Sequence, residues 1–498
     1  MGEKVGAMDG KGLAMRKFVI VTLLWCAAVH SQTVLSLDDA MSIAMQNSPQ
    51  IQQAELNLER SSQSLKAQRA ALKSNFSLSV NPYSYSYDRR YDRFRNIWYS
   101  SENTSSSADF RIRQPILWTD GTFSIINRLQ WLEGWSEAGS AQTEPWSNNL
   151  YLTYEQPIFT YNRTKLALGE LELDLENTTI NYVLQKLALE YDVTNSFYEI
   201  YRNQLGYDIA REEYANTNNS YQIIKNKVDA GIAAREELYQ AELNLLNSQS
   251  SVQNNLVLLQ NSLDSFKKLI GVPIPDSIDI VGDVAHTVVD IDLAAAIDSG
   301  LKHRLELRQR EIEIQSAYNG LVETMALNEF RGNISLTYGI QGVNETFESM
   351  YDSPDRNRQA SISFEIPLYD WGERRARIKA SEASIESRKL SQEEARDDIV
   401  ISIRQAHRQL QNLVNQIEIA GQNVENADLT YQINLERYKN GDLTSMDLNL
   451  YQIQLSDAKK QLTDSIINYK LALLNLKILS MYDFVRDQAV IPEELLSE

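Results

Sequence analysis

The distribution of hydrophobic and polar residues divides the chain into predicted helices and strands, and the same order of elements occurs twice. Apolar residues at helical spacing predict a short, a medium, a very long and a long helix in each half. The predicted helices span residues 36–46, 49–74, 164–228 and 234–269 in the first half, and 292–302, 304–328, 374–438 and 444–480 in the second.

Strict alternation of apolar and polar residues predicts strands between the second and third helix of each half. In the second half, "NISLTYGI" and "SISFEI" each place their apolar residues on one face. The first half contains four such stretches, near residues 76–88, 107–118, 121–132 and 149–159. We therefore expect short sheets with one apolar and one polar side.

Two turn segments show that the chain contains an internal repeat. "YQIIKNKVDAGIAAREELYQ" contains Gly231 and Glu237, and "YQINLERYKNGDLTSMDLNLYQ" contains Gly441 and Asp447, at a constant offset of 210 residues. Upstream of the strands the offset is 256, so the first copy holds 46 additional residues. We predict a segment 1–31 followed by two structural repeats, 32–285 and 286–498, with helical hairpin tips near 231 and 441.

Apolar or small residues in the last very long helix recur at steps of four and three, the period of a coiled-coil seam. A simple dimeric coiled coil or a helical bundle would also fit this pattern. A helix of this length measures roughly 95 Å, and its two shorter neighbours together nearly match it. We therefore expect a tall wall of packed helical hairpins. The seam residues are Ile399, Ile403, Ala406, Leu410, Leu413, Ile417, Ala420, Val424, Ala427 and Tyr431.

Composition and the N-terminus indicate an exported protein. The net charge is −19 and the isoelectric point is near 4.8, which argues against nucleic acid as a partner. Arg16 and Lys17 precede the apolar run "FVIVTLLWCAAV", which predicts a signal peptide cleaved after Ser31, with a membrane anchor as the alternative. Cys26, the single cysteine, lies in this segment, where it is either removed or lipid-modified.

Tryptophan and tyrosine gather in the strand regions. Aromatic side chains at strand ends, flanking alternating positions, are typical of transmembrane β-barrels, although a soluble sandwich would also bury them. A few strands cannot close a barrel alone, and a membrane barrel has no free edges, so the chain must share its barrel with copies of itself. The candidate membrane-interface residues are Trp98, Trp118, Trp131, Tyr369 and Trp371.

These residues resemble the outer-membrane efflux channels of the TolC type. The resemblance lies in the opening "LDDAMSIAMQNSPQI", the paired motifs "QPIFTYN" and "IPLYDWGERRARI", and the paired tips "VDAGIAAREEL" and "YKNGDLTSMDL". It implies a mostly helical α+β homotrimer with a periplasmic α-barrel and a shared transmembrane β-barrel, in the outer membrane of a Gram-negative bacterium. It further implies a periplasmic adaptor protein and an inner-membrane pump of the RND or ABC type as partners.

The resemblance also assigns roles to residues at the tips. Acidic side chains just past each turn narrow the entrance, and a tyrosine before the second turn helps to close it; these match Asp447, Glu237 and Tyr438. Three-fold symmetry would turn each acid into a ring of like charge that attracts cations. Alternatively, both acids are ordinary solvated residues near helix N-termini. The residues expected to contact the adaptor are Gly231, Ile232, Ala233, Gly441, Asp442 and Leu443.

Two residues depart from the family pattern. Leu450 stands where a further acidic ring residue can occur, so only one acidic ring is supported in the second repeat. Leu443 stands where a basic latch residue is sometimes found, which puts a gating salt bridge there in doubt.

The 46 additional residues allow two interpretations. They add two strands, which would give six per chain and eighteen in a trimer, or they form a flap outside the barrel. With the additional strands, Arg111 and Arg113 are expected to face the lumen.

The sequence contains no arrangement that indicates catalysis or a cofactor. After the predicted signal peptide three scattered histidines remain, which lack metal-ligand spacing, and no phosphate-binding loop or nucleophile motif occurs. We therefore expect no enzyme activity, no metal and no cofactor, and a role as the exit duct of a tripartite efflux or type I secretion system. The alternative is a secreted coiled-coil scaffold without a pore. The transported substrate and the type of pump stay open.

Overall fold

The computed structural model describes residues 33–490 except 95, 137–138, 144, 283–284 and 441. The predicted signal peptide and Cys26 lie outside the described residues. The chain folds into two compact units. One contains the residues up to Gln53, Gln185–Leu293 and Ile403–Gln488; the other contains Ala54–Leu184, Ala294–Ser402 and the C-terminal residues. Each unit draws on both halves of the sequence, so the repeats 32–285 and 286–498 stay a prediction about the sequence.

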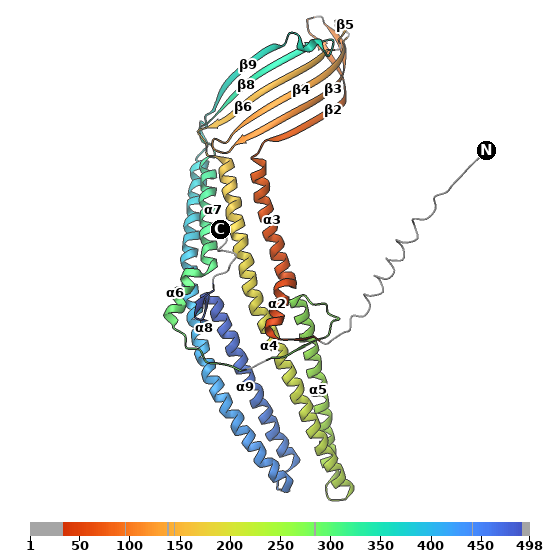
Figure 1. Ribbon diagram of the computed structural model, residues 1–498, viewed down its shortest axis with the longest axis vertical. Coiled ribbons are helices and arrows are strands. Elements are labelled where there is room, and N and C mark those ends of the chain that lie inside the picture. Colours follow the sequence, from red (N-terminus) through yellow and green to blue (C-terminus); the bar gives the residue numbers. More distant parts are fainter. Residues whose placement is uncertain are drawn as a thin grey trace, which may run out of the picture. The chain divides into compact units, whose positions relative to one another are not determined.

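The eight predicted helices are present, most with ends within one or two residues of the expected positions (Figure 1). The very long helices contain 67 and 68 residues, and each return helix contains 36. In the first half they are α2 (Leu37–Asn47), α3 (Pro49–Ala71), α4 (Arg163–Asp229) and α5 (Arg235–Ile270). In the second half they are α6 (Leu293–His303), α7 (Leu305–Met325), α8 (Glu373–Asn440) and α9 (Ser445–Ser480).

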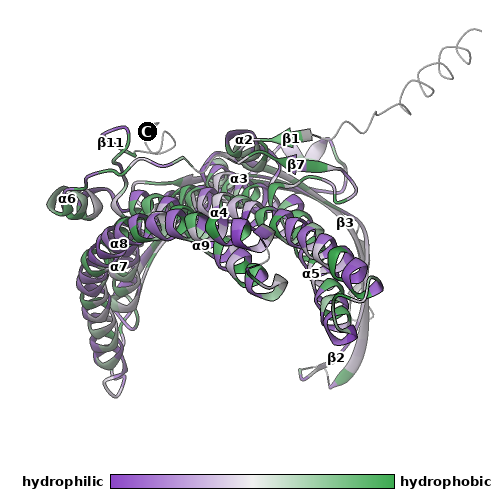
Figure 2. Cartoon of the chain, turned by 90° about the horizontal axis from the view of Figure 1, so that it is seen from below, coloured by the Kyte–Doolittle hydropathy of each residue, from purple (hydrophilic) through white to green (hydrophobic). Residues whose placement is uncertain are grey.

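The predicted seam of α8 is a buried face over most of its length. Its first seven positions, from Ile399 to Ala420, are at most 8% exposed, whereas Val424, Ala427 and Tyr431 are half-buried. Hydrophilic and hydrophobic residues are interspersed along the helices (Figure 2).

The first unit contains an aromatic and aliphatic core where α4, α5 and α9 contribute large side chains. Phe197 and Phe266 are fully buried with ring centroids 6.3 Å apart. The hydroxyl of buried Tyr469 accepts a hydrogen bond from the Val289 amide (3.0 Å) and donates one to the Thr287 carbonyl (3.3 Å). Tyr469 thus holds the segment that links the two halves.

Two local contacts fix both ends of α2 in this unit. The strand β1 (Thr33–Leu35) pairs in parallel with β7 (Ile278–Ile280). Gly271 ends α5 with φ of +75°, and a Cβ there would lie 2.1 Å from the Asn47 carbonyl oxygen. Only glycine therefore fits where α5 passes the end of α2.

The second unit contains a sheet of six long strands in the order β2-β3-β4-β6-β8-β9, every neighbouring pair antiparallel (Figure 1). The first half supplies four of them and the second half two, as predicted, and all six lie in one sheet rather than in a separate flap. The strands are β2 (Asn75–Asp92), β3 (Ile97–Ile116), β4 (Gly121–Ser136), β6 (Trp146–Ile158), β8 (Arg331–Asn344) and β9 (Asp355–Glu365).

One strand of this sheet was not predicted. The short β5 (Gly139–Thr143) pairs only with β4, outside the six-strand path. Its sequence "GSAQT" has no apolar alternation, so periodicity could not indicate it.

The register gives the sheet one apolar and one polar face, because side chains of paired residues share a face and alternate along each strand. The apolar face carries residues such as Leu78, Phe110, Ile125, Leu152 and Ile362. The polar face at the corresponding positions is mainly serine, threonine, asparagine, glutamine and charged residues. Among them are Ser77, Arg111, Ser124, Thr153, Ser335 and Ser361.

A register shift between Asn81 and Ser84 keeps β2 consistent with this division. Before the shift the even positions, such as Val80, share the apolar face; after it the odd positions do, among them Tyr85 and Tyr87. An extra residue in one strand of an antiparallel pair has this effect on alternation. The irregularity therefore places the tyrosines of β2 on the same face as its aliphatic residues.

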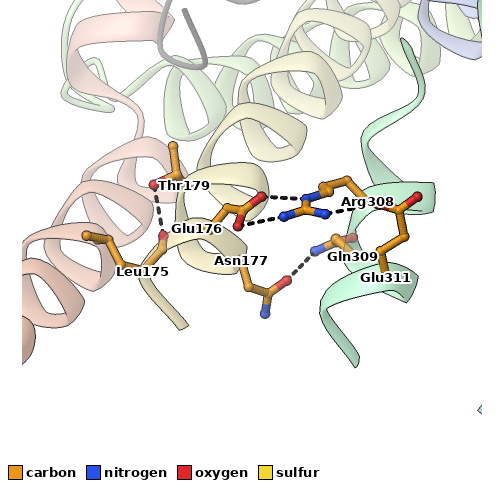
Figure 3. Close-up of polar contacts among 7 residues, drawn as sticks. All are labelled: Leu175, Glu176, Asn177, Thr179, Arg308, Gln309 and Glu311. Atoms are coloured by element: carbon orange, nitrogen blue, oxygen red, sulfur yellow. Dashed lines mark hydrogen bonds and ion pairs between the residues drawn. The ribbon is translucent and has the colours of Figure 1, made fainter. Parts of the chain in front are cut away.

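The helices of this unit are joined by polar contacts. Arg308 of α7 binds Glu176 of α4 through two nitrogens, at 2.6 and 3.1 Å, and it also binds Glu311 at 2.9 Å (Figure 3). The side-chain amide of Gln309 donates to the side-chain oxygen Oδ1 of Asn177 at 3.0 Å. The carboxylates raise the pKa of Arg308 further above its ordinary value. Hydrogen bonds thus supplement packing between the predominantly polar faces of these helices.

The start of α4 is anchored to the turn between β3 and β4. The Asp120 carboxylate accepts hydrogen bonds from the Arg163 and Thr164 amides at 3.4 and 3.1 Å, and also contacts the Thr164 hydroxyl. The Asn162 side chain donates to the Leu117 carbonyl at 2.5 Å. These contacts tie the first very long helix to one end of the sheet, here called the helix end.

Candidate functional site

The first hairpin tip is a glycine-terminated helix end. Gly231 has φ of +76°; its amide donates to the Val228 carbonyl (2.9 Å), and the Ile232 amide donates to the Lys227 carbonyl (2.8 Å). This hydrogen-bond pair defines the Schellman motif, in which glycine occupies the left-handed position. Ile232 extends from the turn with 77% of its surface exposed, and Ala233 is half-buried. The tip thus presents one large apolar side chain.

The second tip repeats the hydrogen bond that spans this turn. The Asp442 amide donates to the Arg437 carbonyl at 2.9 Å, and both residues lie 210 positions after Ile232 and Lys227. Gly441 itself lies outside the described residues. Asp442 is exposed and Leu443 half-buried, so this tip presents a carboxylate where the first presents isoleucine.

The two acidic residues have different surroundings. Asp447 lies in the first turn of α9, where its carboxylate accepts a hydrogen bond from the Thr444 hydroxyl (2.6 Å) while its amide donates to that hydroxyl oxygen (3.2 Å). Glu237 lies at the equivalent position of α5, whose N-cap residue, Ala234, makes no side-chain capping hydrogen bond. Both acids are exposed, but only Asp447 has its carboxylate fixed by a cap.

The sequence pattern Thr444-x-x-Asp447 is the capping signature that sequence reasoning overlooked. It would have predicted this contact, because a hydroxyl followed three residues later by an acid marks a helix start. Thr444 is therefore a residue to add to the candidate site.

Tyr438 lies in a small cavity of about 160 Å³ in the first unit, lined by residues of α4, α5, α8 and α9. Its neighbours there include Ile223, Tyr431 and Leu448. The tyrosine is half-buried. The structure thus brings Tyr438 against both hairpins just before the second tip, while Asp447 and Glu237 are exposed.

The predicted interface aromatics fall into two groups along the sheet. Trp118, Tyr369 and Trp371 lie at the helix end, with the last two rings in edge contact at 4.7 Å. Their exposed fractions are 91%, 73% and 88%. Trp98 and Trp131 lie toward the opposite end, on the apolar face.

The distance between these groups suits a membrane. Along β4, the apolar positions from Phe123 to Trp131 cover about 27 Å at ~3.4 Å per residue. Transmembrane barrels carry an apolar band about 25 Å tall between aromatic girdles. Sequence reasoning missed further aromatic residues near the far end, Trp146 and Phe347, whose rings meet edge to face at 5.4 Å.

A large hollow of about 980 Å³ lies on the polar face at the helix end. The ends of α3 and α4 line it together with polar-face positions of the sheet, among them Arg113, Thr122, Glu155 and Ser363. The polar face of the sheet and the adjoining ends of α3 and α4 therefore line one common hollow.

Within the described ranges, no group of three or more histidine, cysteine, aspartate or glutamate residues is arranged to hold a metal ion. In the same part of the chain, no helix combines the length and apolar character needed to cross a membrane.

Comparisons with known proteins agree with this architecture. Residues 296–479 match the family model described as outer membrane efflux protein. The outer membrane protein TolC of Salmonella enteritidis is 22% identical over 360 residues, covering 69% of this chain and 70% of the relative. TolC of Escherichia coli is 21% identical over 361 residues, covering 69% and 71%. The Campylobacter jejuni outer membrane channel CmeC has a TM-score of 0.68 at 13% identity, covering 92% of this chain and 88% of that one.

The chain is thus similar to outer membrane efflux proteins, in sequence over residues 296–479 and in fold over most of its length. The resemblance to TolC-type channels stated from the sequence is confirmed, and the matched relatives are named as outer membrane proteins. The Campylobacter jejuni structure is named as that of an outer membrane channel.

Proposed function

We propose that three copies of this chain form one export duct, whose sheets close a shared eighteen-strand barrel in the outer membrane. The observation that carries the proposal is the six-stranded sheet with an apolar face, a polar face and two unpaired edges, β2 and β9. A sheet with open edges is not tolerated in a bilayer, so each edge needs a partner strand.

The two edges are compatible with each other. All neighbouring strands are antiparallel and their number on the path is six, so β2 and β9 run in opposite directions. The β9 edge of one copy can therefore continue antiparallel into the β2 edge of the next, with apolar faces outward and polar faces toward a lumen. Closed cyclic symmetry satisfies every edge in the same way.

The helical hairpins would form the periplasmic α-barrel of this duct. We infer that its tips meet a periplasmic adaptor through Gly231, Ile232 and Ala233 and through their counterparts Gly441, Asp442 and Leu443. Rings of Asp447 and Glu237, with Tyr438 between the hairpins, would restrict the entrance. An inner-membrane pump of the RND or ABC type would supply the energy, as the exit duct of a tripartite efflux or type I secretion system requires.

Cysteine cross-linking tests the shared barrel directly, because the sequence contains no cysteine other than Cys26. Ser77→Cys on β2 would be combined with single cysteines at 359, 361 or 363 on β9, all on the polar face. Oxidised membranes should give covalent dimers and trimers in at least one pairing. The matched control pairs Ser77→Cys with Ser335→Cys on β8. Because β8 is not an edge strand, this variant should stay monomeric on oxidation.

The same experiment separates the duct from the coiled-coil scaffold. A scaffold predicts a water-soluble elongated oligomer with no β2–β9 cross-link in any pairing and no heat-sensitive trimer after detergent extraction. That result would overturn the proposal.

A further inference from the structure

The polar face of the sheet carries a cluster of arginines with an excess of positive charge. Asp109, Arg111 and Arg113 alternate along β3, and Arg128 lies directly opposite Asp109 on β4, so all four share the polar face. Arg128 binds Asp109 through two nitrogens at 2.6 and 2.8 Å. One carboxylate therefore faces three guanidinium groups, which leaves a net charge of +2 in the cluster.

Arg111 and Arg113 are the arginines that carry this excess. Arg111 lies between Ser77 and Ile126 in the ladder, and Arg113 between Asn75 and Ser124, so neither has a carboxylate at a directly paired position. Both are exposed, and neither forms an ion pair in the part of the chain that the structure describes. Their donors are thus available to a ligand.

Other charges on the polar face lie near the two ends of the sheet. Toward the helix end, Glu365 is paired with Arg331 at 2.5 Å, and Glu155 lines the hollow. Toward the far end, Asp88 is paired with Arg90 at 2.8 Å. Between them, β6, β8 and β9 contribute neutral residues to this face, such as Thr153, Thr337 and Gln359.

The cluster adjoins the hollow at the helix end. Arg113 lines that hollow together with Arg163 of α4. Of the acids there, Asp120 is engaged by the start of α4 and Glu365 by Arg331. With Glu155, the lining holds three arginines and three carboxylates, so the excess of positive charge lies in the β3–β4 cluster and not in the hollow.

From this juxtaposition we propose that Arg111 and Arg113 form an anion-attracting zone in the duct and favour cargo that carries carboxylate or phosphate groups. The inference rests on the proposed function, which turns the polar face toward the lumen. Three copies would place six such guanidinium groups around one passage. Arginine suits this role because its planar fork binds carboxylates and phosphates through two parallel hydrogen bonds and stays charged at every physiological pH.

The test uses the purified full-length protein in planar lipid bilayers. Inositol hexakisphosphate is added on the side of the bilayer opposite to the helical hairpins. This polyanion should block the wild-type current, and the R111S/R113S double variant should need at least about tenfold more of it, which corresponds to ~1.4 kcal/mol. The R111K/R113K variant, which keeps the charge but loses the fork, should lie between the two.

The matched control removes two arginines from the opposite face. Arg356 and Arg358 lie on the apolar face of β9, so the R356S/R358S variant should be blocked like the wild type. Equal block of the wild type and R111S/R113S, with both migrating as heat-sensitive oligomers, would overturn the anion zone. Absence of any conductance in the wild type would instead overturn the proposed duct.

Discussion

The two hairpin tips share one turn-closing hydrogen bond and differ in their side chains. Both turns are closed by the same hydrogen bond between residues five positions apart. The Ile232 amide donates to the Lys227 carbonyl in the first tip, and the Asp442 amide donates to the Arg437 carbonyl in the second. The N-cap residue of the helix that follows is Ala234 in the first tip, which makes no side-chain cap. In the second tip it is Thr444, whose hydroxyl caps the helix. The hydrogen bond that spans the turn is therefore common to both tips, whereas the side chains that a partner would meet are not.

The comparison of the tips distinguishes residues that the turn requires from residues that are free to serve the proposed site. A turn between antiparallel helices needs a left-handed residue, and Gly231 supplies it. Nothing in that turn requires an acid six residues later, yet Glu237 and Asp447 occupy this place in both tips. In the second tip the carboxylate also supports the start of the helix, so the proposed role of Asp447 would overlap with a structural one.

The largest expected effect concerns the acidic rings. At about 7 Å in water, one carboxylate attracts a divalent cation by ~1.2 kcal/mol, and a trimer would supply three. The Asp447→Asn variant, which removes the charge but keeps an acceptor for Thr444, should therefore weaken divalent-cation block of single channels by at least about tenfold. Glu237→Gln is the matched variant in the first tip and should also weaken the block. Unchanged block in both would mean that the acids are ordinary solvated residues.

The next effect concerns the shared turn. Gly231→Val forces a β-branched residue into the left-handed region, at a cost of about 1–2 kcal/mol. A Cβ at Gly231 meets no atom within 4 Å, so the cost comes from backbone conformation and not from a clash. Amide hydrogen exchange should accelerate at the end of α4 and the start of α5. Gly231→Asn, which tolerates this conformation, should exchange more slowly than Gly231→Val; equal rates would point to a steric cause.

Removing the cap should make the second tip resemble the first. Thr444→Ala deletes the hydroxyl that binds the Asp447 amide and carboxylate, and loss of a helix N-cap costs about 1 kcal/mol. Hydrogen exchange in the first turn of α9 should accelerate several-fold, with α5 unchanged. Thr444→Ser keeps a hydroxyl and serves as the control; identical exchange in both variants would show that the cap contributes nothing.

The smallest effect is the reciprocal change. Ala234→Thr introduces a capping hydroxyl at the start of α5, where Glu237 stands as Asp447 does in α9. We expect a local gain of less than about 1 kcal/mol, seen as slower exchange of the Glu237 amide. Faster exchange there would show that the first tip cannot adopt the geometry of the second.

Most of the helical architecture could be predicted because long helices carry strong periodic patterns and end at identifiable residues. The tips were located to within a residue or two, since Gly231 and Gly441 interrupt otherwise continuous helices. The six long strands were predicted, but several extend beyond the predicted ends. Strand ends are weakly marked once serine and asparagine replace apolar residues, as in "SSENTSSSAD" of β3.

The details that escaped prediction depend on pairing between strands. Alternation in β2 is interrupted at Asn81, and the sequence alone does not say that a register shift restores the tyrosines to the apolar face. The pairing of Arg128 with Asp109 likewise follows from register, which depends on where the β3–β4 turn closes. Arg111 and Arg113 lie on the polar face of the sheet, as expected of lumen-facing residues, but their excess of charge became visible only with that pairing.

The unpaired strands β2 and β9 have a consequence for biogenesis. A newly secreted copy that completed its sheet while alone would offer two long templates for strand addition to any chain it met, which is the route to aggregation. Safe passage to the membrane therefore demands either an escort that masks both strands or a schedule in which the helices fold first and the sheet last. In the proposed duct, the strands that would join the copies would thus also determine the order in which the assembly can form.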